Sequence, residues 1–149
     1  MRPGLARTSL ICCLWCASAG VDAAPPAEPA AREVIDRFTS ALTAEDSGLL
    51  RAVLPRRGSV QLRLDRLGPE NGSFTSAQVE ALFRDVFDRT TVRSVETLRI
   101  EHEPHGLAFA RARLRLTDRD GREASVELRL GLRDEDGRWV LREIRESPA

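Results

Sequence analysis

Cysteine is confined to the start of the sequence, and histidine is scarce throughout. Cys12, Cys13 and Cys16 are the only cysteines, and His102 and His105 are the only histidines. If the first residues are removed, the remaining chain has no thiol for a disulfide, a cysteine metal site or thiol catalysis. No His/Cys spacing typical of a metal site occurs either. We therefore expect no metal, no cofactor and no thiol chemistry.

Lysine is absent, so every basic side chain that could bind an acidic partner is an arginine. The sequence also lacks a glycine-rich phosphate loop and a Gly-x-Ser-x-Gly nucleophile elbow. Without residues 1–23 the chain carries 21 basic and 22 acidic residues, which leaves no long-range attraction for nucleic acid or anionic lipid. Aromatic residues that could stack on bases do not accompany the arginines. We expect no nucleic-acid partner.

The first residues have the pattern of a secretory signal. Arg2 and Arg7 precede a short apolar run at 10–17, and small residues follow. The run is shorter than the roughly 20 residues that span a bilayer. We predict a signal peptide over residues 1–23, cleaved after Ala23 or, as second choice, after Ala19. The protein is then exported, periplasmic or secreted, with no membrane span after cleavage.

Two alternatives to a cleaved signal remain open at this point. The segment could stay as an N-terminal anchor, or residues 10–13 could serve as a lipobox for a lipid-anchored form, although Ile11 and Cys12 stand where smaller residues are usual. Residues 24–29, rich in proline and alanine, predict an extended tether. Residues 30–147 then form a single domain.

Helical periodicity occurs in three segments. Residues 30–43 carry one apolar stripe, and Asp46 or Ser47 can cap a short helix, carrying Leu49 and Leu50, that Pro55 ends. Thr75 and Gln78 form a capping box at the start of a third helix, which runs to about residue 87.

Alternating apolar residues predict strands over 58–67, 92–103, 107–117, 124–132 and 138–145, with a turn at 68–72. A slip in the alternation predicts a β-bulge at Glu96–Thr97. A three-residue turn with Gly121 in the left-handed conformation sets a register in which paired residue numbers sum to 240. Asp136 and Gly137 predict the last hairpin.

The order helix, helix, strand, helix and four long strands resembles the nuclear-transport-factor-two-like superfamily. This cystatin-like cone is shared with ketosteroid-isomerase-like and polyketide-cyclase-like (SnoaL-like) proteins. Residues 136–144 (DGRWVLREI) are similar to the usual last strand, and residues 58–87 resemble small uncharacterised exported bacterial members. The resemblance implies an α+β fold of order α-α-β-α-β-β-β-β, with N-terminal helices packed on a strongly curved antiparallel sheet. It also implies a pocket at the open end of the cone and often a dimer through the sheet.

Enzymes of this superfamily use ionisable residues inside the cone. Glu143 shares strand parity with Trp139 and points inward with it, unless Val140 and Ile144 are the inward pair. Glu96, at the expected bulge, has the same ambiguity, and His102 faces the cone mouth or is an edge histidine. The candidate pocket-lining residues are Phe38, Phe83, Glu96, His102, Trp139 and Glu143.

Arginines alternate with inward apolar residues on two strands and predict a charged outer sheet face. We expect this face to be solvated or to form an isologous homodimer through ion pairs rather than to bind anions. Its candidate residues are Arg111, Arg113, Arg115, Glu127 and Arg129.

The leading functional hypothesis is an exported, non-enzymatic binding or protein-interaction module with a small apolar pocket. Its partner is then a small apolar ligand or an envelope protein. The alternatives are a small-molecule isomerase or cyclase-like enzyme that uses an acid in the cone, and a purely structural, envelope-associated dimer.

Overall fold

The computed structural model describes residues 27–68 and 71–147. The elements in chain order are α1 (Ala27–Thr43), η1 (Ser47–Ala52), β1 (Val60–Arg63), β2 (Asn71–Phe74), α2 (Ser76–Arg89), β3 (Thr90–Glu103), β4 (Leu107–Asp118), β5 (Glu123–Glu135) and β6 (Arg138–Ser147). The predicted signal peptide lies outside the described residues, as do residues 24–26 of the tether. Helix α1 begins at Ala27, so the tether is shorter than expected, because Pro29 is tolerated in a first helical turn.

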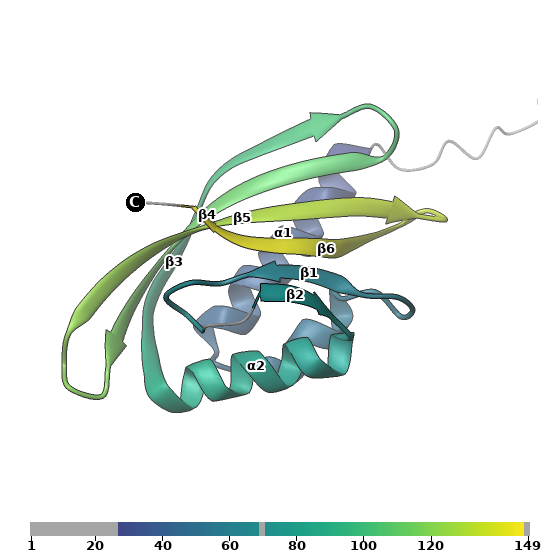
Figure 1. The fold of residues 1–149 in the computed structure, drawn as a ribbon. Coiled ribbons are helices and arrows are strands. Elements are labelled where there is room, and N and C mark those ends of the chain that lie inside the picture. Colours follow the sequence, from purple (N-terminus) through teal and green to yellow (C-terminus); the bar gives the residue numbers. More distant parts are fainter. Residues whose placement is uncertain (1–26, 69–70, 148–149) are drawn as a thin grey trace, which may run out of the picture.

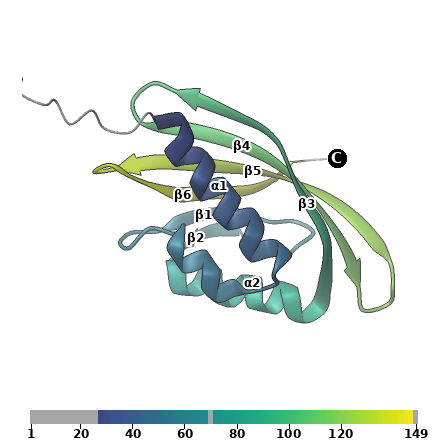
Figure 2. The same ribbon diagram turned by 180° about the vertical axis from the view of Figure 1, so that it is seen from behind.

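The six strands form one sheet in the order β2-β1-β6-β5-β4-β3. All neighbours are antiparallel except β1 and β6, which are parallel. Helix α1 crosses one face of the sheet (Figure 2), which we call the concave face. Figure 1 shows the opposite, convex face, which neither helix covers. The predicted α+β cone is confirmed.

Strand β2 is absent from the predicted order and lies partly in the segment predicted as a turn. Strands seldom contain the residue types found at Asn71, Gly72 and Ser73, so composition alone indicates a loop there. The strand forms because its backbone pairs with β1, Val60 lying opposite Phe74.

The predicted register of the central hairpin is confirmed. Leu114 lies opposite Val126 and Arg113 opposite Glu127. Gly121 has a φ of +79°, which a residue with a side chain adopts only with strain. At the last hairpin Asp136 and Gly137 have φ values of +54° and +82°, the left-handed pair that a two-residue turn requires.

The bulge in β3 lies later than predicted, and the strand contains a second one. The pairing with β4 shifts between Val92 and Ser94 and again between Thr97 and Arg99, which leaves Arg93 and Leu98 as the extra residues. The sequence shows only that the alternation changes phase, not which residue is the extra one. The prediction of Glu96–Thr97 was therefore wrong in position.

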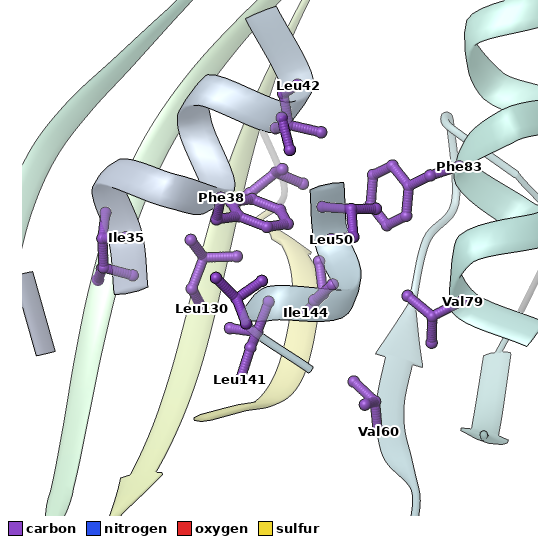
Figure 3. Packing of buried hydrophobic residues seen from close by; sticks show 14 of the residues in the cluster. Ile35, Phe38, Leu42, Leu50, Val60, Val79, Phe83, Leu130, Leu141 and Ile144 are labelled. Atoms are coloured by element: carbon purple, nitrogen blue, oxygen red, sulfur yellow. The ribbon is translucent and has the colours of Figure 1, made fainter. Parts of the chain in front are cut away.

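The core lies between α1, η1, α2 and the concave face of the sheet (Figure 3). Phe38 from α1 and Phe83 from α2 meet edge to face at its centre, with ring centroids 6.1 Å apart. The capping box of Thr75 and Gln78 begins α2 as predicted. Leu49, which was expected to pack in the core, is 49% exposed. The short helix is a 3-10 helix, and its tighter winding turns Leu50 inward instead.

Candidate binding cavity at the end of the cone

The predicted aromatic pocket residues fill the cone. Phe38 and Phe83 are fully buried and Trp139 is nearly so. The principal cavities of the part of the chain that the structure describes lie elsewhere, and none of them is lined by these three side chains. These aromatic residues therefore pack the core and do not line an open pocket.

Glu143 lies on the convex face, which corrects its prediction as a pocket acid. Strand β6 carries an extra residue at Arg142, so Leu141 and Ile144 both point inward, opposite Leu132 and Leu130. The same bulge turns Glu143 outward, where it lies opposite Gly131 and forms an ion pair with Arg145. The alternation of the sequence does not reveal this bulge, because both faces of the strand are partly apolar.

Glu96 also lies outside the cone. It stands opposite Arg113, with its carboxylate 3.8 Å from the Arg113 guanidinium, and its side chain is 63% exposed. Glu96 and Glu143 are thus exposed or half-buried members of the convex face and do not line a cavity in the cone.

His102 lies on the concave face, at the exposed end of β3. It stands opposite Ala108, and its ring meets Trp139 edge-on with centroids 6.3 Å apart. The three ionisable candidates therefore do not come together. Within residues 27–68 and 71–147, no buried side-chain nitrogen or oxygen lacks a hydrogen-bond partner, and no cluster of His, Cys, Asp and Glu is suited to a metal ion.

A largely apolar space lies at one end of the cone, between the end of α2, the segment after β1 and the β4–β5 hairpin. We call it the end cavity; its volume is about 380 Å³, within the range of small-molecule pockets. Its apolar wall comes from Leu67, Val86, Leu116, Ala124 and Val126. All of these except Ala124 are buried.

The rim of the end cavity is polar and rich in arginine: Arg66, Arg89 and Arg122 stand beside Asp118 and Glu123. Arg89 donates from Nη2 to the Leu67 carbonyl at 3.4 Å, and Arg66 donates from Nη1 to the Ser125 carbonyl at 3.5 Å. Because a carbonyl oxygen carries no formal charge, these long bonds do not neutralise the two guanidinium groups. The rim can therefore accept an anionic group on a ligand whose apolar part occupies the cavity.

Two acidic residues here, Asp118 on the rim and Glu146 behind Leu67, have structural tasks. The Asp118 carboxylate accepts the main-chain N–H groups of Asp120 and Arg122 at 2.9 and 2.8 Å and so holds the hairpin turn. Glu146 accepts the main-chain N–H groups of Arg66 and Leu67 at 2.8 and 2.7 Å, which fixes Leu67 in the cavity wall. Neither carboxylate is placed for acid–base work on a bound molecule.

The family resemblance implied a pocket at one end of the cone, but none of the residues predicted to line it lines the end cavity. Its residues come from four segments that lie side by side only after β1 has paired with β6 and the hairpin has curved over α2. Leu67 was recognised as the end of an alternating strand, but the structure ends that strand at Arg63. No local pattern identifies such a site.

The charged residues predicted for the outer sheet face lie together on the convex face, because the register of β4 and β5 is the predicted one. Arg111 and Arg113 both donate to the Glu127 carboxylate, at 2.7 and 3.1 Å, and Arg115 is exposed beside them. The hydrogen bond from Arg113 and then that from Arg111 lower the pKa of Glu127 below its ordinary value. The guanidinium carbon of Arg129 lies 4.7 Å from the centre of the Phe109 ring.

No family model matches the sequence, and no curated protein matches it significantly. Solved structures match the fold. A nuclear-transport-factor-two-like design superposes with a TM-score of 0.61 at 17% identity, over 80% of this chain and 98% of the design. A DUF4783 family protein from Bacteroides uniformis gives 0.61 at 12% identity, over 76% of this chain and 95% of that protein.

A ketosteroid isomerase-like protein from Erwinia carotovora atroseptica is similar to the same degree. Its TM-score is 0.60 at 14% identity, over 80% of this chain and 96% of that protein. At these identities the similarity establishes the fold and leaves the activity open.

Proposed function

We propose, from the premise that the chain has the nuclear-transport-factor-two-like fold, that it is an exported, non-enzymatic module that binds a small apolar molecule. The observation that carries the proposal is the end cavity, with its apolar wall and arginine rim. The separation of Glu96, His102 and Glu143 supports the non-enzymatic part, because acid–base catalysis needs such groups within reach of one bound molecule.

Binding is tested with anilinonaphthalene sulfonate, a dye with an apolar body and one anionic group. Ala124 lines the cavity but is exposed, so Ala124→Trp fills the space without repacking the core. We expect the variant to bind the dye about tenfold more weakly, a loss of about 1.4 kcal/mol. Ala81→Trp, at an exposed position of α2 away from the cavity, is the matched control and should bind as the wild type does. Equal binding by all three proteins would overturn the proposal.

Export is tested on the full chain with a C-terminal tag. The proposal expects the protein in the periplasm or medium, with a mature N-terminus at Ala24 by intact mass. A mass that retains residues 1–23 contradicts cleavage, and a mass increased by acyl chains identifies the lipid-anchored alternative. Within the described residues, no helix is both long and apolar enough to cross a membrane.

A further inference from the structure

The convex face of the sheet carries a row of arginines, one from each of five neighbouring strands. Arg63 lies opposite Arg145, Arg145 opposite Arg129, Arg129 opposite Arg111, and Arg111 opposite Arg99. Directly opposed residues point to the same face. Because the residues next to them along the strands, such as Leu62, Leu130 and Ile144, are buried on the concave side, all five arginines lie on the convex face, and all five are exposed. Strands lie about 4.8 Å apart, which makes the row about 19 Å long.

This arrangement is unfavourable for folding, because like charges directly opposite one another destabilise a sheet. The rows on either side hold the compensating carboxylates. Arg99 pairs with Glu101 at 2.7 Å, Arg111 pairs with Glu127 at 2.7 Å, and Arg145 pairs with Glu143. Carboxylates therefore border the row on both sides, and one bordering row also holds Arg113, opposite Glu127. The near-zero net charge of the chain conceals the arginine row.

Two arginines of the row, Arg63 and Arg129, form no ion pair with any residue that the structure describes. The guanidinium of Arg129 lies over the Phe109 ring in a cation–π contact. This contact uses the face of the guanidinium, so the N–H groups at the edge of the guanidinium can still donate hydrogen bonds to a ligand. A surface depression of about 620 Å³ is lined by both of these arginines and by Arg66 and Arg145, with the carboxylates of Asp65 and Glu146 at its border. There is thus space for an anionic group beside the two unneutralised charges.

We propose, against the expectation from the sequence that this face does not bind anions, that the arginine row binds linear inorganic polyphosphate laid across the strands of the sheet. Guanidinium groups bind phosphate oxygens in bidentate fashion, and a line of them suits a chain of such groups. An extended acidic peptide presents one carboxylate on one face only about every 6.6 Å, whereas a polyphosphate chain carries anionic oxygens on every phosphate and so offers more charge to a row of closely spaced arginines. A membrane surface would also meet the carboxylates that border the row. The inference goes beyond the proposed function, because the end cavity and this depression share only Arg66, which does not belong to the row.

The test uses the purified protein and a linear inorganic polyphosphate, with orthophosphate at equal phosphate concentration as the comparison. Simultaneous contacts should make the chain bind at least about a hundredfold more tightly than orthophosphate. When the logarithm of the binding constant is plotted against that of the salt concentration, the two unpaired arginines should give a slope of at least about −1.4 to −1.8 in size, and contacts from all five would bring it to about −3.5 to −4.5. Equal, weak binding of the two anions would overturn the proposal.

The row is distinguished from the face as a whole by two double variants. Arg63→Ala with Arg129→Ala removes the two unpaired arginines, so no carboxylate loses its partner and the fold should be kept. Arg115→Ala with Arg133→Ala makes the same charge change on the same face outside the row. We expect the first pair to weaken binding about tenfold or more and reduce the salt slope by about two, and the second to change affinity less than about twofold.

Equal losses in the two double variants would contradict a specific row. A second outcome would also contradict the proposal: a wild-type dimer that does not bind polyphosphate and that becomes a monomer in the Arg63→Ala, Arg129→Ala variant. The occupant of the row would then be a second copy of the chain. Dye binding at the end cavity should be unchanged in both double variants, so failure here is distinguishable from failure of the proposed function.

Discussion

At the scale of single residues, Glu127 shows how the convex face is held together. Its carboxylate takes hydrogen bonds from Arg113 and Arg111, which lowers its pKa. A carboxyl group whose pKa is depressed in the folded state stabilises the fold at pH values above its unfolded pKa of about 4.3, and this contribution is lost as the pH falls through the folded value. Glu127 therefore makes part of the stability sensitive to acid.

We predict that Glu127→Gln is less stable than the wild type at neutral pH and that the gap closes on acidification. The gap should be constant above about pH 5.5 and shrink below about pH 4.3, because a protonated Glu127 resembles the glutamine. Urea unfolding midpoints measured across this range provide the check. A gap that is independent of pH, or that widens in acid, would show that the arginine contacts do not set the stability of this face.

At the scale of elements, an ion pair connects η1 to α2. Glu80 on α2 is a nearly buried carboxylate and accepts two bonds of 2.9 Å from the Arg51 guanidinium, which is itself largely exposed. Removing the arginine leaves a buried acceptor without its partner, which costs more than the loss of an exposed pair.

We predict that Arg51→Ala lowers the thermal midpoint by a few degrees and that Arg51→Ala with Glu80→Gln recovers most of the loss, because an uncharged side chain is less costly to bury. Arg37→Ala is the matched control, since it breaks the exposed pair with Glu33 and should leave the midpoint almost unchanged. If the double variant were no more stable than Arg51→Ala, the burial of an uncompensated charge would not be the cause.

Elements whose signals are local were predicted from the sequence. The capping box at Thr75, the apolar stripe of α1 and the left-handed turn at Gly121 each depend on a few adjacent residues. The bulges at Arg93 and Arg142 and the strand β2 were not predicted, and the bulge at Leu98 was predicted too early in the strand, because pairing with another strand decides them. The bulge at Arg142 had the largest consequence, since it moved Glu143 from the expected pocket to the convex face.

At the scale of the whole molecule, the order of elements was enough to predict the fold but not the candidate sites. The end cavity joins four separate segments, and the arginine row joins five strands; both exist only once the sheet order is known. The alternation of arginines along β4 indicated a charged face, yet the row runs across the strands, a direction in which the sequence carries no periodicity.

A bound ligand should occupy the end cavity and not the centre of the cone. A methyl-resolved NMR titration of the protein with anilinonaphthalene sulfonate distinguishes the two positions. We expect the dye to shift the methyl signals of the cavity residues Leu67, Val86, Leu116 and Val126 and to leave those of the core residues Leu132 and Leu141 in place. Shifts concentrated at Leu132 and Leu141, or no saturable shifts at all, would contradict this expectation.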